Sequence, residues 1–295
     1  MRSLLLTFLA MLLMQFPAAA QAPAAVASLK PESGSIALPE AEAELHLGEY
    51  YRFYGPSGAR TILIDIWENP PAEADGVLGI IMPADATPDQ RSWGAVVTWE
   101  PIGWVSGENA RDADYEELLA QMQSATRALN PQRRAQGFPE VQIMGWAQEP
   151  RHDSVANTVS WARELRFFDG EPHTLHYDLR VLGRRGVLSM NVVGTMDQLD
   201  EIRTAGDDLS GRVTFNPGAR YADFDAQRDN VANYGVAGLV ATGVGVAVAK
   251  NVGVLAVLAK LLQPLGIALL ILAAAIATPV RRLFGRTRPD GPVIR

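Results

Sequence analysis

The sequence predicts an α+β domain, an antiparallel sheet meander with two amphipathic helices, followed by a C-terminal hydrophobic transmembrane segment. Three observations indicate this. Apolar and polar residues alternate with a period of two over residues 141–193, as in strands with two different faces. Two other segments show helical spacing behind capping residues, and residues 236–280 are largely apolar. Strands and helices come in runs, which is typical of α+β domains.

The first elements of the domain are predicted to be strands. Residues 43–53 and 61–67 are rich in residues that favour strands, and the second run stops at the breaker Asn69-Pro70-Pro71. A further strand is indicated by alternation of large and apolar residues at Trp93, Ala95, Val97 and Trp99.

Two helices are predicted from capping residues and periodicity. Asp114 is the expected N-cap of the first, with Glu117 three residues later, and its apolar positions repeat from Tyr115 to Leu129. Thr195 and Gln198 form a second capping box, which opens a helix that ends before Gly211.

The meander between the two helices is predicted to have four strands and one face in water. In its third strand one face has Leu175, Tyr177, Leu179 and Val181, and the other has Thr174, His176, Asp178 and Arg180. Alternation of this kind is typical of an antiparallel sheet with one solvated face.

The hydrophobic run divides at two lysines, which affects its expected topology. Residues 236–249 would form a helix of about 21 Å, short of a hydrocarbon core of about 30 Å. Residues 261–278 would reach about 27 Å and are the better span. Lys250 and Lys260 are expected near an interface, where they can snorkel. One crossing and a helical hairpin both remain open.

Small residues recur at every fourth position in the first part of this run. Such a stripe lets two helix backbones approach closely in a membrane. It predicts either self-association into a homo-oligomer or packing against the second apolar segment, whereas an Ala- and Gly-rich composition is the alternative explanation. The seam comprises Ala237, Ala241, Gly245, Ala249 and Gly253.

The chain's first residues resemble a cleaved signal peptide. Arg2 precedes an apolar stretch and the small residues Ala18-Ala19-Ala20. We therefore expect residues 1–20 to be a signal peptide, 21–39 a flexible tether, 40–233 an exported domain, 234–280 a hydrophobic anchor and 281–295 a basic cytoplasmic tail. The expected location is the inner membrane, with its lipid as a partner and the main domain periplasmic.

Charge and cysteine content exclude several classes of function. The chain has 26 basic and 33 acidic residues and a net charge of −7, and Asp290 is the only acidic residue after Asn233. An acidic exported domain repels nucleic acid, so we expect no nucleic-acid partner. The absence of cysteine excludes disulfides, thiol catalysis and thiolate metal sites.

Three long segments resemble a known family. They are MGWAQEPRHDSVANTVSWAREL, LHYDLRVLGRRGVLSMNVVG and ARYADFDAQRDNVANYGVAGLVATG, which begin at Met144, Leu175 and Ala219. The chain is similar here to the bacterial membrane-anchored proteins classed as domain of unknown function 2167. The resemblance implies an envelope location and one domain with an anchor, and it implies no activity.

No motif in the sequence identifies a reaction, a cofactor or a metal site. The four histidines, at 46, 152, 173 and 176, form no metal-binding pair with helical spacing. Asp223, Asp225 and Asp229 lack the glycine and glutamate of a calcium loop. No catalytic, cofactor-binding or metal residue is therefore assigned, and whether the protein is an enzyme stays open.

Two groups of residues are candidates for binding. Arg180, Arg184 and Arg185 lie on or near a predicted turn in an acidic domain, and guanidinium groups suit carboxylate or phosphate partners, although a solvated turn would look the same. Six tryptophans could line a stacking surface or form core, and Trp161, which shares a strand face with Val159 and Leu165, is expected in the core.

Two functions are consistent with these features. One is a non-enzymatic, membrane-anchored periplasmic module that binds a protein or another component of the bacterial cell envelope. The alternative is a cell-envelope hydrolase with unidentified carboxylate catalysts. A deep cleft with converging polar groups would favour the hydrolase, and a sheet face with tryptophans inside would favour the binding module.

Overall fold

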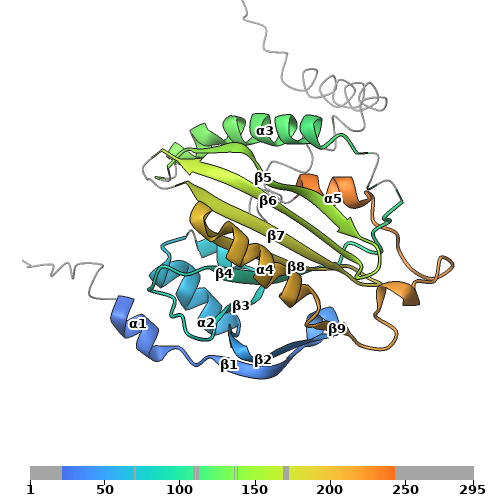
Figure 1. Ribbon diagram of the computed structural model, residues 1–295, viewed down its shortest axis with the longest axis horizontal. Coiled ribbons are helices and arrows are strands. Elements are labelled where there is room, and N and C mark those ends of the chain that lie inside the picture. Colours follow the sequence, from blue (N-terminus) through green and yellow to red (C-terminus); the bar gives the residue numbers. More distant parts are fainter. Residues whose placement is uncertain are drawn as a thin grey trace, which may run out of the picture. The chain divides into compact units, whose positions relative to one another are not determined.

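The computed structural model of the chain describes residues 22–242, except 70, 109, 111–112, 136, 138 and 169–172. Within these residues a nine-stranded antiparallel sheet forms the centre of the fold (Figure 1). Its strands lie in the order β1-β2-β3-β4-β8-β7-β6-β5, and β9 also pairs with β2. The strands are β1 Glu32–Leu38, β2 Ala43–Tyr54, β3 Val77–Pro83, β4 Gly94–Glu100, β5 Val141–Asp153, β6 Thr158–Phe167, β7 Thr174–Leu182, β8 Val187–Thr195 and β9 Val213–Phe215.

The predicted α+β class and the four-strand meander are confirmed. Strands β5 to β8 pair in sequence order, each antiparallel to the next. The strand predicted around Val97 is β4, which pairs with β8 and joins the meander to the first half of the sheet.

Both predicted helices are present with their caps. Helix α3 spans Tyr115–Ala135, and the Asp114 carboxylate accepts a hydrogen bond from the Glu117 backbone N–H at 2.9 Å. The Thr195–Gln198 capping box opens a short 3-10 turn that leads into α4, Leu199–Ser210. The other helices are α1 Ala22–Ser28, α2 Pro56–Arg60, the π-helical η3 Thr61–Ile66, the 3-10 turns η2 Pro39–Ala41, η4 Pro71–Ala74 and η6 Tyr221–Asp223, and α5 Val236–Thr242.

Two predictions from the N-terminal part of the chain are wrong. The sequence predicts a tether over residues 21–39, whereas the structure forms α1 and then β1, which pairs with β2 from Ser35 to Leu38. Ile36 and Leu38 are buried there, so their side chains give this segment a place in the core. Residues 61–66, predicted as a strand, continue the helix that Pro56 opens at its first turn.

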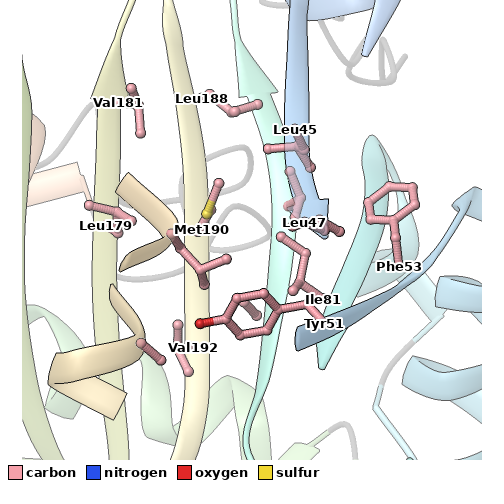
Figure 2. Close-up of a cluster of buried hydrophobic side chains, with 14 of the residues drawn as sticks. Leu45, Leu47, Tyr51, Phe53, Ile81, Leu179, Val181, Leu188, Met190 and Val192 are labelled. Atoms are coloured by element: carbon pink, nitrogen blue, oxygen red, sulfur yellow. The ribbon is translucent and has the colours of Figure 1, made fainter. Parts of the chain in front are cut away.

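One face of the sheet encloses the largest core. Leu45 and Leu47 of β2 cluster with Leu188 and Met190 of β8, although β3 and β4 lie between β2 and β8 in the sheet (Figure 2). Ile81 of β3 and Ala95 and Val97 of β4 belong to the same cluster and link the two strands. Helix α4 packs over β7 and β8 and contributes apolar side chains to the same core, namely Ile202, Ala205 and Leu209.

The opposite face is covered by several separate segments. Helix α3 packs on β5, and η3 supplies Ile62 and Leu63 to a cluster that includes β3. The third cover is α5 together with Val105 and Ala110, which cluster with Trp161 of β6. The start of the hydrophobic run is thus part of the domain core, with Val236, Leu239 and Val240 at most 1% exposed.

No helix among the described residues is both long enough and apolar enough to cross a membrane. The predicted anchor region, residues 234–280, is described only as far as Thr242, and its better predicted span, residues 261–278, lies outside the described residues.

Candidate functional site

A row of polar side chains crosses the sheet on the face that α3, η3 and α5 cover. Thr98, Ser189 and Arg180 are direct cross-strand neighbours on β4, β8 and β7. Asn191 and Asp178 form the next row, and Arg163 of β6 lies opposite His176 of β7. We call these residues and Glu100 the polar strip: Thr98, Glu100, Arg163, His176, Asp178, Arg180, Ser189 and Asn191.

Asp178 holds the strip together through two arginines. Its Oδ2 accepts a hydrogen bond from Arg163 Nη2 at 2.7 Å, and its Oδ1 accepts one from Arg180 Nη2 at 3.1 Å. Arg180 Nη1 also donates to Asn191 Oδ1 at 3.0 Å. The three charged side chains are only 3% to 5% exposed, so removing either partner would leave a buried charge without compensation.

The solvated sheet face predicted from the sequence is wrong at these positions. Asp178 and Arg180 are buried because α3, α5, Val105 and Ala110 cover this face. The Arg180 guanidinium carbon lies 5.0 Å from the centre of the Trp161 ring, so the arginine also makes a cation–π contact.

Two polar atoms of the strip have no hydrogen-bond partner within the described residues. Arg180 Nε and Thr98 Oγ1 are buried and make no hydrogen bond there. The Oε1 atom of Glu100 lies 3.9 Å from Arg180 Nε, beyond hydrogen-bond length. Glu100 instead accepts a hydrogen bond from Ser189 Oγ at 2.5 Å.

His176 is neutral near pH 7 in this environment. Burial is the main cause that lowers its pKa to about 4, and the positive charge of Arg163 acts in the same direction. The negative charge of Asp178 opposes them and is the smallest of the three effects. The strip therefore has two arginine cations and two carboxylates.

The arginines predicted as an interaction site are not gathered into one group. Arg180 is buried in the strip, whereas Arg184 and Arg185 lie on the β7–β8 turn. Arg184 pairs with Asp229 at 2.7 Å and donates to the Gly218 carbonyl, and Arg185 pairs with Glu42. Their role in binding stays a prediction.

Asp229 joins Arg184 to the loop that follows β9. The Arg184 guanidinium is the main cause that lowers the pKa of Asp229, and a hydrogen bond from the Asp225 backbone acts in the same direction. The aspartates that resemble a calcium loop in sequence thus bind backbone N–H groups and an arginine. Within the described residues no group of three acidic or histidine side chains is placed to hold a metal ion.

None of the six tryptophans is freely exposed. Trp161 is fully buried, as predicted, and Trp93 is 2% exposed. Trp104 stacks with Tyr221 and with Phe224, with ring centres 4.9 and 4.3 Å away. An exposed row of stacking tryptophans is therefore not formed.

The small-residue seam is only partly described. Ala237 and Ala241 lie in α5, whereas Gly245, Ala249 and Gly253 lie outside the described residues. Association through this seam stays a prediction.

The polar strip could not be predicted from the sequence. Arg163, Glu100, Thr98, Ser189 and Asn191 come from three strands whose partners are up to about ninety residues apart. The available signal was the pair Asp178 and Arg180 within an interior strand of a meander, since charged residues there are rare unless they are paired.

Comparison with known proteins identifies the family. The family model described as "Protein of unknown function (DUF2167)" matches residues 30–276, most of the chain. The chain belongs to this family, as the resemblance of its long segments indicates.

The other comparisons add little. No curated protein matches the chain. Among solved structures, cyanobacterial PsbP (CyanoP) from Synechocystis sp. PCC 6803, a solution structure, is similar with a TM-score of 0.34 and 12% identity, over 65% of this chain and 94% of that chain. At so low a TM-score, nothing about fold or function follows from this likeness.

Proposed function

We propose that this protein is a binding module of the bacterial cell envelope, anchored in the inner membrane by its C-terminal hydrophobic segment, with its main domain in the periplasm. The observation that supports this best is the position of α5. The first residues of the hydrophobic run pack in the domain core as α5, so the run that contains the proposed anchor begins inside the folded domain. The proposed location is supported by the signal-peptide pattern and the basic C-terminal residues.

The binding role is supported by the pairing of the buried charges with one another. Both oxygens of Asp178 accept hydrogen bonds from arginines, and the tryptophans pack inside. These are features of a packed scaffold. The alternative, an envelope hydrolase, has no observation of its own in its favour.

The location can be tested by labelling single cysteines, because the native chain has none. Val155 is 91% exposed on the β5–β6 turn, so Val155→Cys should react with a membrane-impermeant maleimide in intact spheroplasts. Arg295→Cys, in the proposed cytoplasmic tail, should react only after lysis. Labelling of Arg295→Cys in intact spheroplasts, or protection of Val155→Cys, would contradict the topology.

The binding role can be tested with a photo-crosslinking amino acid at one position. Arg185 is half-exposed on the candidate turn, and Arg127 is an exposed control on α3. Irradiation of living cells should give a discrete adduct from position 185 and none from position 127. Equal adducts from both positions, or none from either, would argue against binding through this turn.

A further inference from the structure

We propose that the outer edge of β5 is a latent surface for pairing with a second copy of this chain, and that α3 keeps this edge closed. The edge is a different surface from the β7–β8 turn, so the proposal goes beyond the function proposed above. Three observations support it: the hydrogen bonds between α3 and β5, the packing of α3, and the uncharged first half of β5.

Side-chain amides of α3 bind the outer edge of β5, which is the last strand of the sheet within the described residues. Asn130 Nδ2 donates to the Val141 carbonyl, and Asn130 Oδ1 accepts from the Val141 N–H, both at 3.0 Å. Gln123 Nε2 donates to the Ile143 carbonyl at 3.1 Å. The Asn130 amide thus supplies both the donor and the acceptor that a neighbouring strand would supply.

Helix α3 lies along the β5 side of the sheet and buries few apolar side chains there (Figure 1). Its buried residues are Leu119, Met122, Thr126 and Asn130, of which two are polar. Thr126 Oγ1 has no hydrogen bond within the described residues, and Pro131 removes one backbone hydrogen bond from the helix. The largest core cluster of the described residues has no member from α3. The helix can therefore separate from β5 while that core stays intact.

The sequence of β5 favours pairing with a second copy. No residue from Val141 to Gln148 is charged, so two such strands in antiparallel pairing bring no like charges opposite each other. Uncharged strand edges of this kind are prone to pair with other chains. Two exposed apolar side chains also lie at this edge, Met144 on β5 and Phe168, whose backbone N–H donates to the Glu140 carbonyl. A twofold pair uses the same segment on both sides, so these features serve both copies.

The hydrogen bonds of α3 also define the register of the proposed pair. Val141 and Ile143 direct main-chain groups away from β6, since α3 binds them. If Val141 of each copy bonds with Ile143 of the other, Gln142 lies opposite its own copy at the twofold axis. Cα atoms in such a pair are about 4.5 Å apart, within reach of a disulfide. Beyond Trp146 the register against β6 shifts twice, which limits regular pairing to the first half of β5.

The test is disulfide trapping of the full chain in detergent, because the native chain has no cysteine. Gln142→Cys can form a disulfide only between two copies. In this variant alone α3 covers the edge, so the disulfide dimer should be a minor product of mild oxidation. Adding Asn130→Ala removes both hydrogen bonds to Val141 and should raise the dimer yield at least about tenfold.

Two controls connect the dimer to the β5 edge. Ser124→Ala, at an exposed position of α3, is the matched control for Asn130→Ala and should leave the dimer yield unchanged. Val155→Cys, on the exposed β5–β6 turn, replaces Gln142→Cys in the Asn130→Ala chain and should cross-link much less. No rise in yield with Asn130→Ala, or equal cross-linking through Val155→Cys, would overturn the proposal.

Two further variants keep the test decisive. Gln123→Ala removes only the bond to Ile143 and should raise the dimer yield less than Asn130→Ala does. If Asn130→Ala fails to fold, as judged by tryptophan fluorescence, Gln123→Ala decides, and no rise with it would overturn the proposal. Without cysteines, Asn130→Ala should increase the mean mass in light scattering. Adding Gln142→Lys places like charges at the twofold axis and should restore the native mass; an increase that survives this change would place the contact elsewhere and refute pairing through β5.

Discussion

Replacing Leu239 by alanine should destabilise the whole domain, although this residue lies in the hydrophobic run. Leu239 is fully buried and clusters with Val236, Val240 and Trp161. Leucine-to-alanine changes at such sites remove apolar contacts and leave a cavity, at a cost of about 3 to 5 kcal/mol in unfolding free energy. The better helix propensity of alanine offsets only a few tenths of a kcal/mol of this loss.

The expected loss is large compared with the stability of a domain. Typical domains are stable by about 5 to 15 kcal/mol, so the variant would lose a substantial part of its margin. For a domain of this size each kcal/mol lowers the midpoint of thermal unfolding by roughly 2 to 4 °C. A shift of about 6 to 20 °C is therefore expected.

The assay is urea unfolding of the full chain in detergent, followed by tryptophan fluorescence. Val231→Ala is the control because Val231 lies five residues before α5 and is 55% exposed. It should change the unfolding free energy by less than about 0.5 kcal/mol. If Leu239→Ala unfolds like the control, α5 is not part of the core, and the support that its position gives to the proposed function is lost.

Two further predictions concern the polar strip. Asp178→Asn should lower the free energy of unfolding in urea by about 3 to 5 kcal/mol, because Arg163 and Arg180 lose their shared carboxylate. The control Asp200→Asn, at a side chain that is 94% exposed, should have little effect. Similar unfolding curves for the two variants would contradict the network. His176 has a pKa lowered from 6.5 to about 4, so its contribution to stability is present above pH 6.5 and is lost as the pH falls toward 4, by up to about 3 kcal/mol. His176→Gln should flatten the pH dependence of unfolding in that window, and an unchanged slope would show that this histidine is not responsible.

Local hydrogen bonds explain which elements could be predicted from sequence. The caps at Asp114 and Thr195 depend on residues three positions apart, so the helix starts can be identified without tertiary information. The meander is predictable for a similar reason, because β5 to β8 pair with their sequence neighbours across short connections.

Residues 61–66 show where local propensity misleads. Their three isoleucines favour a strand, but Pro56 opens a helix just upstream and the chain continues it. Ile62 and Leu63 are then buried against β3 and reach at most 5% exposure. Burial of these side chains contributes more than the small helix penalty of a branched residue.

The polar strip was beyond sequence reasoning because its cover comes from distant segments. Alternation in β7 correctly separates Leu179 and Tyr177 from Asp178 and Arg180. The alternation does not show which face of the strand is exposed to solvent. Both faces are buried, because α4 covers one side and α3 and α5 cover the other. Alternation thus distinguishes the two faces of a strand, and only the tertiary packing decides their exposure.

The placement of Trp161 has a mechanical consequence. This side chain clusters with the apolar residues of α5 on one side and lies beneath the Arg180 guanidinium on the other. A pull on the chain beyond Thr242 would load α5 first, then Trp161, and through it the arginine that is bonded to Asp178 on β7. Tension at the C-terminal end of the described residues would therefore reach a central strand of the sheet through the side chains of Trp161 and Arg180.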